Sequence, residues 1–228
     1  MSWNTCLFCY AQERGGTFFG LQQETNFGLQ QEPYEGSLLL EDPKGQILIS
    51  TKVTYSGRYG TNRDISVAVR AALERPYTLR VKKQSALQEG VNTVLDGLDL
   101  GARILGKKTD LSPDYGAPEL ADDRGIKTNE PEFTRWVLQS RELRAVLDAN
   151  PNFWFQVGPT GPEGPDHLVE ARVSLDSYMD ILDEPIGLEQ QKAYYRNSSF
   201  PKQLDALVEL AKAARDAVTA WPMPMRTP

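Results

Sequence analysis

The chain has few of the residues that disulfide frameworks, metal sites and catalytic imidazoles require. Among its 228 residues are two cysteines and one histidine. Two cysteines cannot build a disulfide scaffold, and a structural zinc site needs four ligands. The sequence therefore predicts a protein outside the disulfide-rich secreted class, and we expect no metal site within one chain.

Long apolar runs and targeting signals are also lacking. No stretch of about 18 apolar residues occurs, so we expect no transmembrane segment. The first residues, MSWNTCLFCYAQERGG, have neither the basic start nor the long apolar core of a secretory signal. We therefore expect a soluble protein of the cytoplasm.

Phosphate-binding glycine motifs are lacking as well. Neither GxxxxGK[ST] nor GxGxxG occurs in the chain. These are the loops whose backbone amides hold the phosphates of nucleotides and dinucleotides. We therefore expect no nucleotide hydrolysis and no cofactor.

The net charge of -6 conceals an uneven distribution along the chain. Residues 1–51 and 84–228 are acidic, whereas residues 52–83 carry 8 basic and 2 acidic side chains. A global nucleic-acid binder is basic overall, so we expect no nucleic-acid partner. A local basic surface is compatible with the pattern.

The first half of the chain is typical of strands and turns. Residues 1–36 are rich in Gly and Gln, without regular periodicity, and we interpret them as an N-terminal arm rather than a core element. SLLLED and QILISTKVTY flank the turn Asp42-Pro43-Lys44-Gly45 and predict a hairpin. ISVAV and YTLRV predict two further strands, because apolar and polar residues alternate in them.

The second half alternates helical and strand patterns. An apolar stripe over 85–98 predicts a helix, and ARILGKKT predicts a strand. The clearest helix is 131–150, with Asn129 as its cap and Phe133 on its buried side. NFWFQVG and HLVEARVSL predict strands, and the stripe over 201–220 predicts a last helix.

Together these patterns predict an α+β fold. Hairpin signals outnumber crossover signals, which favours an antiparallel or mixed sheet with about three helices packed mainly on one face. Residues 37–221 would form a single domain. The arm 1–36, which contains the FGLQQE duplication, would precede it, and residues 222–228 would form a C-terminal tail.

Five pieces of the chain follow one another in a characteristic order. They are TYSGRYGTNRDISVAV, PYTLRVKKQ, RILGKKTDLSPDYG, DDRGIKTNEPEFTRWVLQSRELRAVLDANPNFWFQVG and LDALVELAKAARDAV. This order resembles a loose group of bacterial α+β domains of unknown function, over about residues 37–220. The resemblance implies one α+β domain with a non-catalytic role. Many relatives of that kind carry membrane helices, whereas no such apolar run occurs here.

Three groups of residues invite a catalytic or metal-binding interpretation. Cys6 and Cys9 form a CxxC that we consider incidental, with a metal site shared between two chains and a redox pair as the alternatives. His167 opens a predicted strand, and we interpret it as an ordinary strand-end histidine. Asp122 and Asp123 would be the carboxylates of a hydrolase, the enzymatic alternative. We assign no catalytic and no metal-binding residue.

The basic segment supplies the candidate binding residues. Arg70, Arg80 and Lys82 occupy strand positions that face away from the apolar side. Such a face can bind an acidic peptide, a phosphate or an anionic lipid headgroup. The alternative is a solvated outer face that pairs with acids from the rest of the chain.

A duplication lies within the predicted arm, where the six residues FGLQQE occur twice with a spacing of eight. In a strand the side chains alternate with a period of two, so Phe19 and Phe27 would share a face, as would Leu21 and Leu29. The copies could form a hairpin, lie on a partner or a second copy of the protein, or reflect a tolerated insertion. These four apolar residues are the candidates for self-association.

These observations favour a non-catalytic domain that binds a protein partner or a second copy of itself. The arm and the basic sheet face would make the contacts. A carboxylate-dependent hydrolase is one alternative. A module that binds an anion or a lipid headgroup on the basic sheet face is the other.

Overall fold

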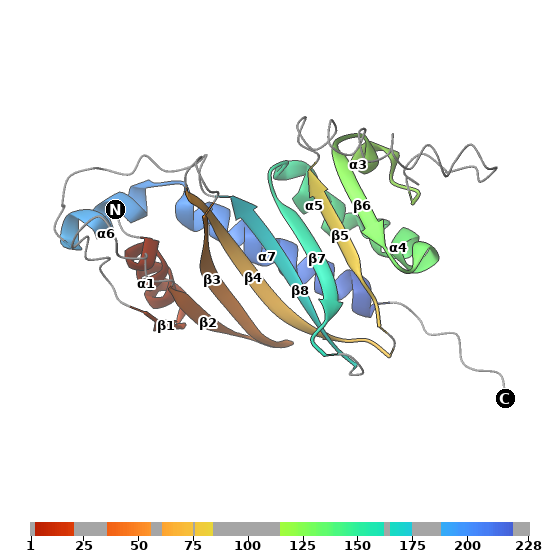
Figure 1. The fold of residues 1–228 in the computed structure, drawn as a ribbon. Coiled ribbons are helices and arrows are strands. Elements are labelled where there is room, and N and C mark those ends of the chain that lie inside the picture. The colour runs from red at the N-terminus through yellow and green to blue at the C-terminus, as the bar shows by residue number, and fades with distance from the viewer. Residues whose placement is uncertain are drawn as a thin grey trace.

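The computed structural model describes residues 3–20, 36–55, 61–74, 76–83, 115–161, 165–174 and 188–220. They form one eight-stranded antiparallel sheet with helices packed against it (Figure 1). The strands are β1 (Thr17–Phe19), β2 (Ser37–Asp42), β3 (Gly45–Tyr55), β4 (Thr61–Ala72), β5 (Leu79–Lys83), β6 (Arg124–Thr128), β7 (Trp154–Pro159) and β8 (Asp166–Ser174). The helices are α1 (Trp3–Arg14), α3 (Pro118–Asp123), α4 (Pro131–Leu138), α5 (Arg141–Ala149), α6 (Leu188–Asn197) and α7 (Phe200–Thr219). The predicted α+β class and antiparallel sheet are confirmed, although the described part of the chain holds six helices rather than about three.

The strand order is β1-β2-β3-β4-β8-β7-β5-β6, and every neighbouring pair is antiparallel. The first four strands follow the order of the chain. The later β7–β8 pair then lies between β4 and β5, so that β5 is three strands away from the strand that precedes it in sequence. Residues of 61–83 that are close in sequence are therefore spread across the sheet.

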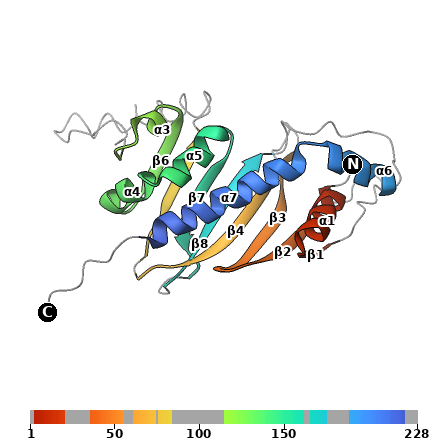
Figure 2. The same cartoon turned by 180° about the vertical axis from the view of Figure 1, so that it is seen from behind.

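Helix α7 covers the middle of one face of the sheet, here called the inner face (Figure 2). It contacts β4, β8 and β7, and α4 and α5 pack beside it. Its predicted apolar stripe is confirmed as buried: Leu204, Leu207, Val208, Ala211, Ala214 and Val218. The strands meet it with their own apolar residues, among them Ile65, Val67 and Val69 of β4 and Phe155 of β7. One continuous core results.

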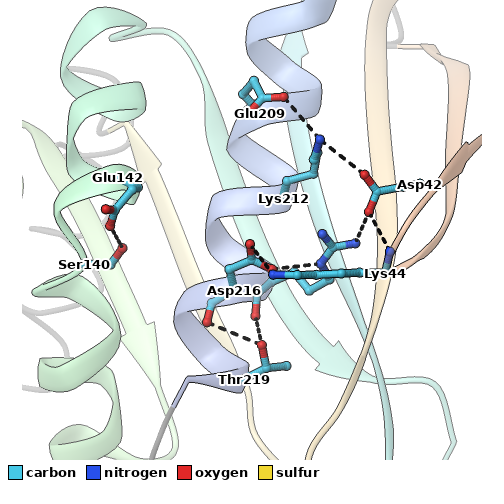
Figure 3. A network of polar contacts seen from close by, with 9 residues as sticks. Asp42, Lys44, Ser140, Glu142, Glu209, Lys212, Asp216 and Thr219 are labelled. Atoms are coloured by element: carbon cyan, nitrogen blue, oxygen red, sulfur yellow. Dashed lines mark hydrogen bonds and ion pairs between the residues drawn. The ribbon is translucent and has the colours of Figure 1, made fainter.

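The predicted hairpin is confirmed, and its turn is attached to α7 (Figure 3). Gly45 has a φ of 119°, which favours glycine, and pairs with Asp42 across the turn. The Asp42 carboxylate accepts from the Lys44 backbone N–H at 3.2 Å and lies 3.0 Å from Arg215 and 3.2 Å from Lys212. Burial by itself raises the pKa of Asp42, but these hydrogen bonds outweigh it and hold that pKa below its usual value. The turn is thereby fixed to the last helix.

The interpretation of residues 1–36 as an N-terminal arm is wrong for residues 3–14. They form helix α1, in which Cys6, Leu7, Cys9 and Tyr10 are buried parts of the core. Helix α1 packs on β1, β2 and α6. Tyr10 donates a hydrogen bond to Asp205 of α7 at 2.8 Å. The first described element therefore belongs to the core layer.

The predicted helix 131–150 is two helices, α4 and α5, separated at Gln139 and Ser140. Ser140 caps α5, because its hydroxyl accepts from the Leu143 backbone N–H at 3.3 Å. Asn129 is not the cap of α4. Its amide instead bonds the backbone of the segment before β5. Phe133 is only partly buried, against Tyr77, with ring centroids 4.5 Å apart.

Other sequence predictions lie outside the described residues. These are the helix over 85–98, the strand ARILGKKT, the tail 222–228 and all of the FGLQQE duplication beyond Gly20.

Candidate functional site

The second face of the sheet, here called the open face, carries the side chains that alternate with the core. In Figure 1 this face is in front, with α7, α5 and α1 behind the strands. Residues that face each other across antiparallel strands point to the same side, so the register identifies the members of the face. From β4 to β6 they include Ser66, Ala68, Arg70, Leu168, Glu170, Arg172, Trp154, Gln156, Gly158, Arg80, Lys82 and Lys127, with Asp64, Ala72, Asp166, Ser174 and Gly125 toward the strand ends.

Trp154 is the centre of a group of cations on the open face. The distance to the centroid of its indole is 5.1 Å from the Arg172 guanidinium, 5.3 Å from the Lys82 ammonium and 5.6 Å from the Arg80 guanidinium. A cation within about 6 Å of an aromatic ring is attracted by the ring quadrupole. Trp154 thus holds together three positive charges from β5 and β8, the two neighbours of its own strand.

Only Arg172 of these three cations has a carboxylate partner within the described ranges. Its Nη2 lies 2.7 Å from Glu170 Oε1, and Gln156 Nε2 donates to Glu170 Oε2 at 2.7 Å. Arg80 and Lys82 form no ion pair with a carboxylate of the described residues. The group therefore carries an excess of positive charge. We call Arg80, Lys82, Lys127 and Arg172 the basic cluster.

A hollow of about 530 Å³ lies further along β7, where Gly158 is one of its lining residues. The space above Gly158 is open, because a Cβ atom built on this residue would meet no heavy atom within 4 Å. Arg80 and Lys127 both line the hollow and face each other across β5 and β6. The remaining lining residues are Thr78, Leu79, Thr128, Asn129, Gln156, Val157, Gly158, Pro159, Leu168 and Glu170. Two like charges opposite each other are unfavourable unless an anion lies between them.

The structure places the three predicted binding residues on one face but not in one group. Arg80 and Lys82 lie together beside Trp154. Arg70 is exposed on β4, opposite Leu168, and three strand spacings of about 4.8 Å each separate it from β5. Sequence reasoning missed Trp154, Arg172 and Lys127. Their outward positions follow from the alternation in their strands, but their proximity depends on long-range pairing.

The two cysteines lie inside the core. Cys6 and Cys9 are buried on α1 and form no disulfide. Burial raises the pKa of the Cys9 thiol, which keeps it in the unreactive protonated form. No group of three metal-binding side chains occurs within the described ranges. These observations favour the incidental interpretation of the CxxC.

His167 is fully buried and uses both ring nitrogens to hold the backbone. Its Nε2 accepts from the Tyr77 backbone N–H at 2.9 Å, so the ring proton is on Nδ1, which donates to the Pro165 carbonyl at 2.9 Å. The predicted strand-end position is correct, since His167 pairs with Ala71 of β4. The imidazole links β8 to the segment that precedes β5 and has no nitrogen left for a substrate.

The carboxylates of the hydrolase alternative are exposed at the end of α3. Asp123 lies 3.7 Å from Arg124, and neither Asp122 nor Asp123 lines the hollow over Gly158. Arg124 itself is buried and donates to the carbonyls of Leu147 and Phe153, which ends α5. This neighbourhood supports a structural role.

A second hollow of about 630 Å³ lies on the helical side, between α4, α5 and the end of α7. Its lining residues are Trp136, Gln139, Ser140, Glu142, Ala213, Asp216, Ala217 and Ala220. Its charged members are carboxylates with partners: Asp216 lies 2.9 Å from Lys44, and Glu142 lies 3.4 Å from the Ser140 hydroxyl (Figure 3). This hollow is acidic, whereas the hollow on the open face is basic.

One of the four candidate self-association residues lies within the described residues. Phe19 ends the edge strand β1 and is 53% exposed on the open face. Leu21, Phe27 and Leu29 lie outside the described residues. Only Phe19 of the duplication lies in strand β1, so the extended form of the two copies and their self-association stay predictions.

No protein-family model and no curated protein matches the chain. The resemblance to bacterial α+β domains therefore stays a prediction. None of the helices in the described ranges is long and apolar enough to cross a membrane.

Proposed function

We propose that this chain is a non-catalytic binding domain that holds an acidic segment of a protein partner on its open face. The observation that carries the proposal is the basic cluster, in which Arg80, Lys82 and Lys127 have no carboxylate partner among the described residues, together with the aromatic surface of Trp154. Trp and Arg are enriched among the residues that dominate protein interfaces. An acidic segment would neutralise the positive charges of Arg80, Lys82 and Lys127.

The state of the buried titratable groups supports binding rather than catalysis. His167 is occupied at both ring nitrogens. Burial raises the pKa of Tyr77 to about 12 and also raises that of Cys9, so both stay protonated near neutral pH. A general base needs a pKa near the working pH and access to a substrate. The hydrolase alternative has less support, because Asp122 and Asp123 are exposed.

Fluorescence anisotropy with a labelled hexaglutamate peptide tests the proposal. We expect binding to the intact chain that weakens between about 0.05 M and about 0.5 M NaCl, because salt screens partly exposed charges. The double variant Arg80→Gln, Lys82→Gln should lose the binding. Arg70→Gln on the same face and Lys202→Gln on α7 remove an exposed cation elsewhere and should retain most of it.

Two results would overturn the proposal. One is full binding by the Arg80→Gln, Lys82→Gln variant, with thermal unfolding confirming its fold. The other is tighter binding of a single-stranded oligothymidine that Trp154→Leu abolishes, because bases stack on exposed aromatic rings. That outcome would assign the open face to a nucleic acid.

We also propose that the protein is located in the cytoplasm, which cell fractionation can check.

A further inference from the structure

We propose that the hollow over Gly158 receives a phosphorylated serine or threonine of the acidic partner segment. This inference rests on the proposed function and names the group that would be recognised within it. It depends on three features of the described residues: a pair of facing cations, a neutralised carboxylate and a floor without a side chain.

The facing cations are Arg80 and Lys127. They are directly paired in the register of β5 and β6, line the same hollow, and form no ion pair with a described carboxylate. A phosphoserine or phosphothreonine side chain carries a charge of about −1.5 to −2 near neutral pH and three acceptor oxygens. It can therefore satisfy both cations at once, whereas one carboxylate of a Glu side chain neutralises only one of them.

The carboxylate in the lining is Glu170, which would repel a phosphate if its charge were free. Arg172 lies 2.7 Å from it, and Gln156 donates to it at 2.7 Å. Its side chain is only 13% exposed. Arg172 thus has a definite role in the hollow: it neutralises the one acidic group, so that the potential there is set by Arg80 and Lys127.

The floor of the hollow is the backbone of β7 at Gly158. The open space above that residue lies beside β5 and allows a bulky tetrahedral group to enter the hollow that Arg80 and Lys127 also line. Leu168 and Pro159 supply an apolar wall at the same level. A short side chain with a terminal phosphate fits this shape: its carbon stem meets the wall and its charge meets Arg80 and Lys127.

The test compares three labelled peptides with one central residue, phosphoserine, glutamate or serine, between identical aspartate-rich flanks. We expect the phosphoserine peptide to bind about tenfold more tightly than the glutamate peptide, the effect of about one additional charge-assisted hydrogen bond. Its advantage should disappear as the pH falls below about 6, where the phosphate takes up its second proton. The glutamate peptide should keep its affinity over that range.

Gly158→Val places a branched side chain on the floor of the hollow without changing any charge, and a β-branched residue suits a strand. It should remove the phosphoserine advantage and leave the binding of the glutamate peptide unchanged. Gly161→Val, in the connection after β7, has equally open surroundings and is the matched control. Lys127→Gln is a second variant, needed in case Gly158→Val does not fold. It should also reduce the phosphoserine advantage, because it removes one of the two cations.

The results separate this inference from the proposed function. If no peptide binds, the proposed function fails and this inference fails with it. If all peptides bind but phosphoserine has no advantage, or the advantage survives both Gly158→Val and Lys127→Gln, only the phosphate inference fails. Tighter binding to vesicles that contain a phosphoinositide than to the phosphoserine peptide would assign the phosphate to a lipid headgroup and overturn the choice made here.

Discussion

The two faces of the sheet differ in composition although the same strands build both. On β7, Phe155 points to the inner face and is fully buried, whereas the adjacent Trp154 points to the open face among cations. On β6, Arg124 is buried and bonds carbonyls, whereas Lys127 lines a hollow. The difference teaches that alternate residues of one strand build the core and the open face, so substitutions can separate stability from the recognition that we propose.

The largest effect that would sharpen this comparison is expected at Phe155. Phe155→Ala removes a fully buried ring and should lower the free energy of unfolding by about 3–5 kcal/mol. Trp154→Ala, one residue away, should cost about 1 kcal/mol, because the indole is already partly exposed. Urea unfolding measures both values. Equal losses at the two positions would contradict the division between the faces.

The two cations of β6 provide the second contrast. Arg124→Met leaves the carbonyls at the end of α5 without their donor and should cost about 2–3 kcal/mol, since unsatisfied buried acceptors are unfavourable. Lys127→Met should change stability by no more than about 0.5 kcal/mol, as for most surface substitutions. Thermal unfolding of both variants checks this. A neutral Arg124→Met would show that the capping contacts contribute little.

Low pH should reduce the stability of the fold through the hairpin turn that contacts α7. The pKa of Asp42 is lower in the folded state than its unfolded value of about 3.9. Its contribution to stability is therefore fully present above pH 4 and is lost as the pH falls through the lower, folded pKa. Asp42→Asn should reduce stability at pH 7 and flatten the decline below pH 4. If stability declines below pH 4 as steeply in Asp42→Asn as in the intact chain, protonation of Asp42 does not cause the decline.

The smallest effect on stability is expected from the basic cluster itself. The double variant Arg80→Gln, Lys82→Gln should unfold within about 0.5 kcal/mol of the intact chain, because both cations are at least partly exposed and lack carboxylate partners. Raising the salt concentration should stabilise the intact chain slightly more than the variant, since it screens their repulsion. A loss of several kcal/mol would show that the cluster also supports the fold.

Most strands could be predicted from the sequence because alternation is a local property. The alternation of Ile65, Val67 and Val69 indicates a strand with one buried face, even when the neighbouring strands are not known. Helix α1 could not be recognised in the same way. Its buried residues include Asn4 and Thr5, which have no apolar periodicity. Asn4 and Thr5 are buried because other elements pack around the helix, and this packing cannot be read from the local sequence.

The candidate site was partly predictable for a similar reason. Arg80 and Lys82 belong to one strand, so their common face follows from spacing alone. Arg70 was grouped with them because it is near in sequence, but the insertion of β8 and β7 between β4 and β5 separates it from them. Trp154 and Arg172 join the site through the same long-range pairing. No local signal reports which strands become neighbours.

The position of α7 has a consequence for the synthesis of the protein. A ribosome makes this helix after every strand of the sheet, yet α7 covers β4, β8 and β7 and anchors the turn between β2 and β3. While the chain is emerging, β4, β8 and β7 lack the helix that covers their inner face, although α1 can already pack on β1 and β2. We expect a nascent chain that ends before Phe200 to be held by chaperones or to aggregate, and to become protease-resistant only once α7 has left the exit tunnel.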